Sequence, residues 1–169
     1  MSLFRRLSFA VLLLSIISTH LSAELREPTD RVLLKVSGQI QHTNQGNEAH
    51  FDRAMLEELQ QRTTRTNTPW TEQADDYRGP LGSALLAAVG AEDAEWMTIS
   101  ALNGFSSEVP VRDFMDYKII LALKKNDRYL RVRNRGPLFV IYPFDEQPHL
   151  NTEMHYNRSV WQVNAIELR

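Results

Sequence analysis

The chain has 169 residues, no cysteine, and 19 basic against 21 acidic residues, which gives a formal net charge of −2. This length is enough for one domain with its own hydrophobic core. The slightly acidic balance argues against nucleic acid or a strongly anionic membrane surface as a partner. Without cysteine, the chain can form neither a disulfide nor a thiol-based site.

The N-terminal residues predict export. Arg5 and Arg6 precede an apolar run, residues 7–17, that is too short to span a bilayer as a stable helix. Small residues follow it and offer a cleavage site. We therefore expect a signal peptide over residues 1–23, ordinary Sec export to the periplasm, and a folded domain over residues 24–169. The alternative is an N-terminal anchor that is not cleaved.

The first half of the predicted domain alternates between strand-like and helix-like patterns. Apolar residues predict a strand over residues 32–38, and β-branched threonines predict another over residues 63–68. Helices are predicted over residues 51–62, where apolar residues fall at helical spacing, and over residues 81–89. Gly90 is expected to cap the second helix, because glycine adopts the left-handed conformation that ends many helices. The polar residues 39–50 predict a turn or hairpin tip.

The second half is richer in strand. Five further strands and one short helix are predicted, at residues 96–102, 119–123, 129–132, 138–142 and 160–168 for the strands and 111–117 for the helix. The polar stretch 148–157, which contains His149 and His155, predicts a surface loop. No histidine is spaced from another ligand as in zinc or iron sites, so no metal site is expected. Together these patterns predict a single α+β domain that is mostly β.

The segment 64–71 is the first candidate binding site, because it is dense in hydrogen-bonding side chains and contains a large aromatic. Trp70 offers a flat apolar face and one N–H donor, which suits stacking against a planar heterocycle. Side chains alternate along a strand, so Arg65 and Asn67 are expected to share one face, with Thr66 between them. The alternative is an ordinary strand end with a core tryptophan and solvated hydroxyl groups.

A second candidate is the turn after the strand over residues 96–102. Asn103 and Gly104 predict the turn itself, and Phe105 follows as a ring that can pack or stack. The alternative is a simple β-turn with a buried phenylalanine.

Arginines alternate in the third candidate region. Arg131, Arg133 and Arg135 would point the same way on one strand, as an anion site or as a docking stripe for an acidic partner. The alternative is the solvated face of an edge strand. Asn134, Arg135 and Gly136 form the stronger ligand candidate, because Gly136 permits a close approach of the backbone to a ligand.

The chain also resembles a known family, through three segments at residues 101–105, 136–138 and 161–163. They are similar to the molybdopterin-binding oxidoreductase domain of the sulfite oxidase family, and the resemblance covers roughly residues 32–168. It implies an α+β fold that is mostly β. Catalytic members hold molybdenum through a cysteine thiolate near the segment of Trp70, where this chain offers Thr66 and Thr68 besides the tryptophan.

The resemblance implies roles for further residues. Phe105 stands where catalytic members usually have a tyrosine that assists at the metal, so this chain lacks that hydroxyl group. Asp113 matches an aspartate able to accept hydrogen bonds from a pterin, although a carboxylate favoured by a helix N-terminus explains it equally well. The loop from Asn134 to Gly136 corresponds to one that lines the cofactor, and Arg158 to a basic residue near the cofactor tail.

With these departures, the chain resembles a non-catalytic branch of the family, the PruR-like periplasmic pterin-binding regulators. That branch implies a pterin without molybdenum as ligand. It also implies a partner in the membrane that makes or degrades cyclic di-GMP, and hence a role in biofilm control. Two alternatives stay open: a molybdopterin-dependent oxidoreductase or a subunit of one, and an interaction domain without a ligand.

Overall fold

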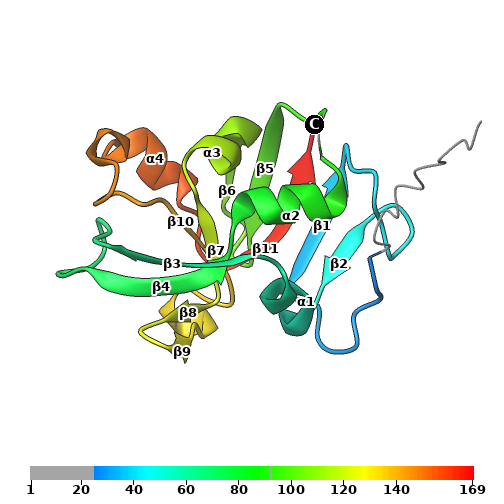
Figure 1. Cartoon of the computed structure of the whole chain (residues 1–169), viewed down its shortest axis with the longest axis horizontal. Coiled ribbons are helices and arrows are strands. Elements are labelled where there is room, and N and C mark those ends of the chain that lie inside the picture. The colour runs from blue at the N-terminus through cyan, green and yellow to red at the C-terminus, as the bar shows by residue number, and fades with distance from the viewer. Residues whose placement is uncertain (1–24, 92) are drawn as a thin grey trace, which may run out of the picture.

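A five-stranded sheet forms the larger half of the protein, whose computed structural model describes residues 25–91 and 93–169 (Figure 1). The predicted signal peptide lies outside these residues. In the part that is described, no helix is long and apolar enough to cross a membrane. The strand order is β2-β1-β11-β5-β6, and the strands are Ala49–Phe51, Leu34–Gly38, Val163–Leu168, Trp96–Ala101 and Ser106–Pro110.

The last strand of the chain lies in the middle of this sheet. β11 pairs in parallel with β1, with Val36 opposite Ile166, and antiparallel with β5, where Ile99 lies opposite the same isoleucine. All three side chains are buried. Both ends of the chain's folded part are thus needed to complete one hydrophobic sheet.

Two smaller sheets form the other half. β3 (Gln61–Thr66) and β4 (Asp75–Pro80) form a ribbon that continues into the short β8 (Lys124–Lys125) and β9 (Arg128–Tyr129). β7 (Ile120–Ala122) pairs with β10 (Phe139–Ile141) in a separate two-stranded sheet. Figure 1 shows the ribbon running across the front of the molecule, with β8 and β9 below it.

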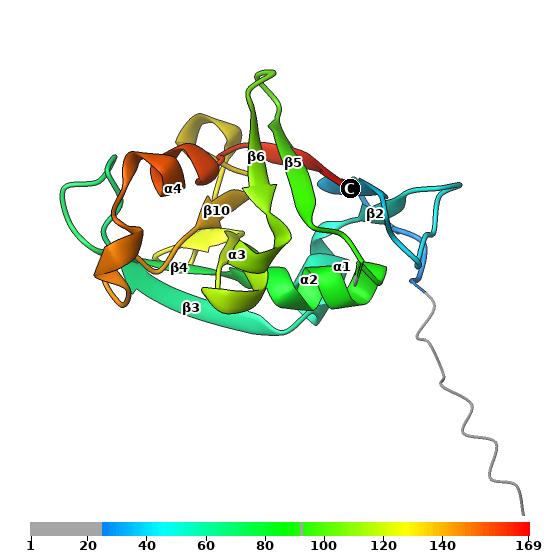
Figure 2. The same cartoon turned by 90° about the horizontal axis from the view of Figure 1, so that it is seen from above.

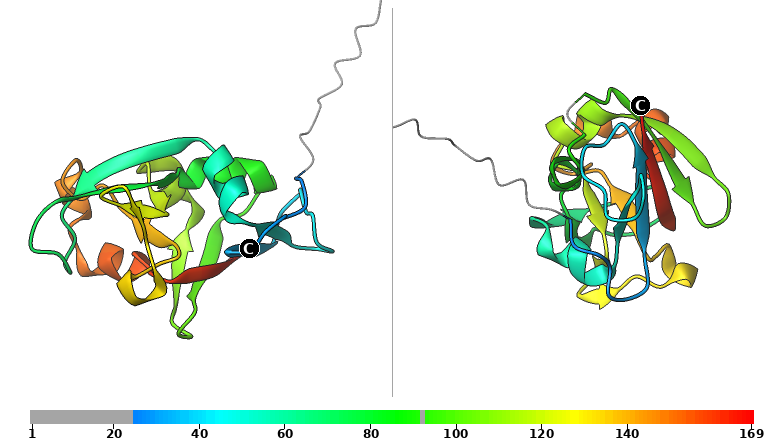
Figure 3. Two further views of the ribbon diagram at one scale, coloured as in Figure 1. Left: turned by 90° about the horizontal axis from the view of Figure 1, so that it is seen from below. Right: turned by 90° about the vertical axis from the view of Figure 1, so that its right-hand side faces the viewer.

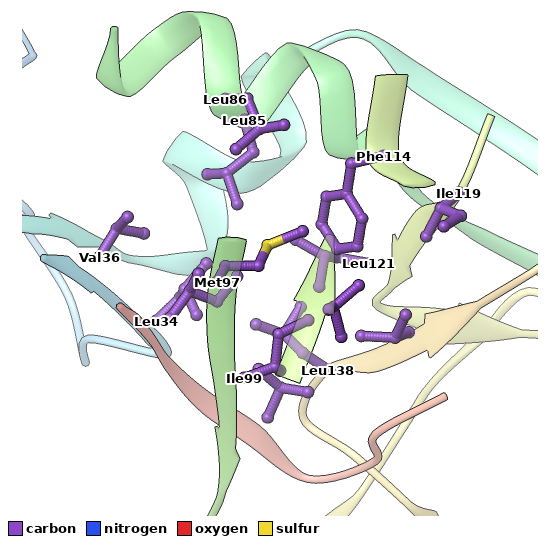
Figure 4. Close-up of a cluster of buried hydrophobic side chains, with 14 of the residues drawn as sticks. Leu34, Val36, Leu85, Leu86, Met97, Ile99, Phe114, Ile119, Leu121 and Leu138 are labelled. Atoms are coloured by element: carbon purple, nitrogen blue, oxygen red, sulfur yellow. The ribbon is translucent and has the colours of Figure 1, made fainter. Parts of the chain in front are cut away.

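The β7–β10 sheet separates two hydrophobic clusters, because side chains alternate along a strand. Leu121, Leu138 and Val140 face the larger cluster, where they meet α2 and the five-stranded sheet (Figure 4). Ile120 and Phe139 face the smaller one. We call this smaller set the second cluster; it consists of Tyr77, Ile120, Ala122, Leu130, Phe139 and Ile141, with Trp70, Leu81 and Trp161 packed against it.

Among the residues that the structure describes, four α-helices and two short 3₁₀ helices connect the strands. α2 (Gly82–Val89) covers the large sheet and ends at Gly90, whose φ of 63° confirms the predicted cap. The others are α1 (Arg53–Glu58), α3 (Val111–Asp116), α4 (Glu153–Arg158), η1 (Val132–Asn134) and η2 (Pro148–Leu150).

The helix predicted over residues 51–62 was too long. Phe51 already belongs to β2, and β3 begins at Gln61, so only six residues form α1. Its apolar positions are spaced for a helix, but the residues at both ends pair with strands instead. β2, β4, β6 and β8 were also not predicted, because their sequences are short or polar.

Two predictions in the second half were wrong. Residues 129–132 do not form a strand; β9 ends at Tyr129 and η1 follows. Arg131 and Arg133 therefore do not lie on one strand face with Arg135, whose φ is 68°. The predicted loop 148–157 contains η2 and most of α4. Short helices rich in polar residues carry little periodic signal, which explains this error.

Candidate functional site

An aromatic pocket lies between the tip of the β5–β6 hairpin and the end of α4. Figure 2 shows this hairpin standing out from the body of the molecule, and Figure 3 shows the same projection from below. The cavity measures about 240 Å³, roughly eight times the share of one water molecule. Its walls are Trp70, Asn103, Phe105, Tyr156, Asn157, Ser159, Val160 and Trp161. We refer to it as the aromatic pocket.

Two tryptophans form the floor of the aromatic pocket. The ring centroids of Trp70 and Trp161 lie 5.0 Å apart with an interplanar angle of 77°. The ring of Tyr156 contacts that of Trp70 edge-on, with 6.5 Å between the ring centroids. Phe139 of the second cluster also packs against Trp70, with 5.9 Å between the ring centroids. Such tilted contacts between rings hold the indoles in place and leave an apolar surface toward the cavity.

The hairpin tip supplies the outer wall. Gly104 has a φ of 86°, and the N–H of Phe105 donates to Oδ1 of Asn103 at 3.0 Å, which confirms the predicted turn. Phe105 is 49% exposed, so the alternative of a buried phenylalanine was wrong. Its ring borders the aromatic pocket, where it is available to a ligand.

No residue that lines the aromatic pocket is a carboxylate, a histidine or a lysine. The hydroxyl of Ser159 donates to the backbone carbonyl of His155 at 2.9 Å and is not paired with a base. A reaction by acid–base or nucleophilic catalysis needs such groups within reach of the substrate. The walls instead suit the binding of a flat apolar ring.

Arg135 contacts the two indoles of the aromatic pocket but does not line the pocket itself. Its guanidinium carbon lies 5.5 Å from the ring centroid of Trp161 and 5.8 Å from that of Trp70, as in cation–π contacts. The side chain reaches this position from a left-handed backbone. Gln162, also left-handed with a φ of 56°, donates from its backbone N–H to the carbonyl of Arg135 at 3.0 Å. Two such residues in contact indicate a backbone held in place by its surroundings.

A second, larger cavity lies on the other side of Arg135. It measures about 560 Å³ and borders the second cluster through Tyr77 and Phe139. Four cationic side chains line it, and we call it the basic cavity; its walls are Tyr77, Lys125, Asn126, Arg128, Tyr129, Leu130, Arg133, Asn134, Arg135 and Phe139. Arg135 lines the basic cavity and also contacts the two indoles of the aromatic pocket.

Gly136 lies close to the backbone of Leu130 within the same loop. A Cβ atom at this position would lie 2.2 Å from the carbonyl oxygen of Leu130. Its N–H donates to the carbonyl of Arg131 at 2.8 Å, and the peptide bond to Pro137 is cis. Glycine is therefore required by the fold of the loop, and it lines neither of the two cavities.

Three candidates at the end of β3 stabilise the fold. Arg65 is exposed and pairs with Asp76 at 3.2 Å. Asn67 follows the end of the strand, so it does not share a strand face with Arg65, and its backbone and side-chain amides donate to Asp145 at 2.9 and 3.2 Å. The buried Thr66 accepts from the N–H of Asp145 at 3.1 Å. None of the three lines either cavity.

Asp113 and Arg158 meet each other as an ion pair. Nη1 of Arg158 lies 3.0 Å from Oδ2 of Asp113, which also accepts from the hydroxyl of Tyr142 at 2.8 Å. Burial, followed by the charge of Asp113, raises the pKa of Tyr142 well above its ordinary value, so the phenol stays a donor. The pair fixes the end of α4 and so positions Tyr156 and Ser159 at the aromatic pocket.

Trp161, Tyr156 and Gln162 were not predicted as site residues. Trp161 and Gln162 occur in a segment on which the family resemblance rests, and this signal would have been enough to include them. Tyr156 gave no signal, because its stretch was taken for a loop. Gln162 joins the parts of the site: its carbonyl accepts from the N–H of Leu102 at 2.9 Å, and its side chain donates to the carbonyl of Val132 at 2.8 Å.

The sequence matches the family described as "Oxidoreductase molybdopterin binding domain" over residues 33–145. The chain belongs to this family. The sequence has no significant match among curated proteins. The sulfane dehydrogenase SoxCD from Paracoccus pantotrophus has a similar structure, with a TM-score of 0.60 and 19% sequence identity. The match covers 80% of this chain and 37% of that one, so this chain spans little more than a third of its length. At this identity the likeness shows the fold, and it confirms the prediction of one small α+β domain that is mostly β.

The residues of this chain offer more contacts to a pterin than to a molybdenum centre. The aromatic pocket offers rings and amides to a pterin. The chain has no thiolate for a metal, and the hydroxyl groups of Thr66 and Thr68 are engaged with Asn67 and Thr71. Over residues 25–91 and 93–169, no group of three or more His, Cys, Asp or Glu side chains could hold a metal ion. The aromatic pocket therefore offers contacts to a flat ring, and the chain offers no thiolate to a metal.

Proposed function

We propose that this chain is a periplasmic protein that binds a pterin without molybdenum and acts as a regulator rather than as an enzyme. The observation that supports this proposal is the aromatic pocket, which has two tryptophan rings and no carboxylate, histidine, lysine or thiolate among its lining residues. A pterin is flat and aromatic, and its edge carries several N–H donors and acceptors. Stacking on the indoles suits its faces, and Asn103 and Asn157 offer amide groups to its edge.

The regulatory part of the proposal rests on the resemblance to the PruR-like branch. We propose that the partner is the periplasmic part of a membrane protein that makes or degrades cyclic di-GMP. The aromatic pocket lies under the projecting β5–β6 hairpin, whose tip carries the exposed Leu102 and Phe105. A ligand that contacts Phe105 would restrict the hairpin tip, and this restriction would change the population of the form that docks.

The direct test is the identity of the bound molecule. The protein would be purified without added ligand, denatured, and the released material examined by fluorescence and mass spectrometry together with metal analysis. We expect a fluorescent pterin in a ratio near one per chain and no molybdenum. Molybdenum in stoichiometric amount would overturn the proposal in favour of an oxidoreductase.

A substitution tests whether the aromatic pocket is the site. Trp70→Ala removes a stacking face, and we expect pterin affinity to fall about 10-fold or more, since an aromatic contact of this kind is worth about 1–3 kcal/mol. Trp96→Ala is the matched control, because Trp96 is 44% exposed and lies at the opposite end of β5 from the turn. Equal loss in both variants would mean that the aromatic pocket is not the specific site, and uptake of no pterin by the unchanged protein would favour an interaction domain without a ligand.

A further inference from the structure

A shallow groove lies where the start of β1, the start of β11 and the end of β5 meet. It measures about 130 Å³, and we call it the bulge groove; its walls include Arg31, Val32, Lys35, Leu102, Pro137 and Asn164. No residue that lines it also lines the aromatic pocket or the basic cavity. The bulge groove is therefore a separate feature of the surface.

A β-bulge in β11 brings Asn164 to this groove. Val163 lies opposite Ala101 of β5, and Ala165 lies opposite the next residue, Ser100, so Asn164 has no partner on β5. An extra residue of this kind bends its strand and changes the direction of a side chain, and bulges are common beside functional sites. Here the bulge places an amide side chain in the wall of the groove.

The side-chain amide of Asn164 has no hydrogen-bond partner in the part of the chain that the structure describes. Its Oδ1 is buried without a donor, which costs stability because the oxygen has lost its contact with water. The Nδ2 group is a free donor of the same side chain. The fold gains nothing from an amide at this position, whereas a binding role explains it.

Two cations line the groove together with this amide. Among the residues that the structure describes, neither Arg31 nor Lys35 forms an ion pair, and both are exposed. The neighbouring carboxylates are engaged elsewhere: Asp30 accepts from the backbone N–H of Arg31 at 2.7 Å, and Glu48 is bound to Nε2 of His50 at 2.6 Å. No residue that lines the groove is acidic, so its charge favours a negatively charged occupant.

The rest of the wall is apolar. Val32, Pro137 and Leu102, which is 45% exposed, line the groove together with the cations. An inorganic anion would leave these apolar surfaces in water. An extended peptide can place an apolar side chain on them and its carboxylates on the cations. The occupant that fits both parts of the wall is an acidic segment of a protein.

We propose that the bulge groove is a docking site for an extended acidic segment of a partner protein. Carboxylates of the segment pair with Arg31 and Lys35, and Nδ2 of Asn164 donates to one of its backbone carbonyls. An apolar side chain of the segment packs on Leu102. This inference deepens the proposed function, on which it rests only for the identity of the partner as a membrane protein.

The probe is a pentapeptide, blocked at both ends, in which a valine lies between two pairs of aspartates. It is added to the purified, ¹⁵N-labelled protein without a pterin, and the side-chain amide signals of Asn164 are followed by NMR. We expect these signals to shift along a saturable isotherm, whereas a peptide with lysines in place of the aspartates should leave them unchanged. Absence of a saturable shift with the acidic peptide would overturn the proposal. An equal response to vesicles of phosphatidylglycerol would overturn it in favour of a membrane surface.

A matched pair of double variants separates the groove from diffuse surface charge. Arg31→Gln with Lys35→Gln should weaken binding of the acidic peptide about 10-fold or more, because two charge-assisted contacts are lost. Arg128→Gln with Arg133→Gln removes two cations from the basic cavity instead, and its effect should be within about twofold. Equal losses in the two double variants would refute a specific site.

Asn164→Ala distinguishes a binding role of the amide from a structural one. Calorimetry should show peptide binding weakened about fivefold, since one hydrogen bond is lost. The stability to urea should stay the same or rise, because the variant also removes a buried oxygen without a donor. Lower stability with unchanged peptide binding would mean that the amide serves the fold, and would refute its role in docking.

The peptide experiments and the pterin experiments fail independently. If the protein binds the acidic peptide but takes up no pterin, the docking site stands and the proposed ligand is wrong. If it binds a pterin but the acidic peptide gives no saturable shift, the docking site alone is refuted.

Discussion

His155 is a partly buried residue on α4, directly before Tyr156 of the aromatic pocket. Its ring lies 5.4 Å from that of Tyr142 and 6.2 Å from that of Tyr117, and its Nδ1 is 2.8 Å from Oγ1 of Thr152. Burial lowers the pKa of His155 below its ordinary value; the nearby Asp113 opposes this shift, and Arg158 adds to it. The imidazole is therefore held in its neutral form on the helix that supplies Tyr156.

Acidification should destabilise the protein through this residue. Because the pKa of His155 is lower in the folded state, the unfolded chain binds the proton more readily. The stabilising contribution is complete above about pH 6.5 and is lost as pH falls through that value toward the folded-state pKa. We expect the free energy of unfolding, measured by urea denaturation, to fall between about pH 7 and pH 5.

The variant His155→Gln isolates this effect. Glutamine keeps a hydrogen-bonding group for Thr152 but cannot take up the proton, so the pH dependence should become flatter than in the unchanged protein. His149→Gln is the comparison: His149 is exposed, lies on η2 and is a lesser cause of the lowered pKa of His155, so this variant should flatten the dependence much less. Parallel curves for the unchanged protein and His155→Gln would show that another group causes the dependence.

At the scale of single elements, α1 depends on one buried carboxylate. Oδ1 of Asp52 accepts from the N–H of Met55 at 2.9 Å, and Oδ2 accepts from the N–H of Thr29 at 2.8 Å. Burial alone would raise the pKa of Asp52, but these hydrogen bonds and the charge of Arg26 hold it below the ordinary value. One side chain thus starts a six-residue helix and ties the N-terminal segment to it.

Asp52→Ala should lower the free energy of unfolding by about 2 kcal/mol, since it removes a helix cap and leaves buried N–H groups without an acceptor. Asp116→Ala is the matched control, because Asp116 is exposed and pairs only with Arg112; its effect should stay below about 0.5 kcal/mol. Chemical denaturation of both variants measures the difference. Equal effects would contradict the capping role.

At the scale of the whole molecule, stability depends on β11, the last strand that the structure describes. β11 lies between β1 and β5, so the sheet joins residues from the two ends of the described chain. The same strand leads out of the aromatic pocket, because Trp161 and Gln162 directly precede it. Packing of the large sheet and the position of the pocket floor are therefore coupled.

Ile166→Ala should cost about 3 kcal/mol of unfolding free energy, because its side chain is 1% exposed and a cavity would form between β1 and β5. Glu167→Ala, on the next residue and the opposite face, should change stability by less than about 0.5 kcal/mol. Thermal and urea unfolding of the two variants measures this contrast. A small effect of Ile166→Ala would mean that the sheet relaxes around the lost side chain.

Local patterns were sufficient for several elements. The helix predicted at residues 81–89 is α2, the strand predicted at 96–102 is β5, and the turn at Asn103 and Gly104 forms as expected. Where the pattern was misleading, a reason can be given. β4 was missed because it begins with Asp75 and Asp76, and two adjacent charged residues do not give the alternation typical of a strand. The alternating arginines predicted a strand, but the backbone forms η1 there instead.

The sequence by itself determined the family, the α+β class and the absence of a thiolate, because each of these depends on residue types and on contacts close along the chain. Only the tertiary structure decided which candidates meet. Trp70, Phe105 and Trp161 come from three distant segments, and they share one pocket because β5, β11 and the end of β3 converge there. Asp113 and Arg158 form an ion pair for the same reason. Long-range packing places Nη1 of Arg158 3.0 Å from Oδ2 of Asp113, and a local sequence pattern cannot predict such a contact.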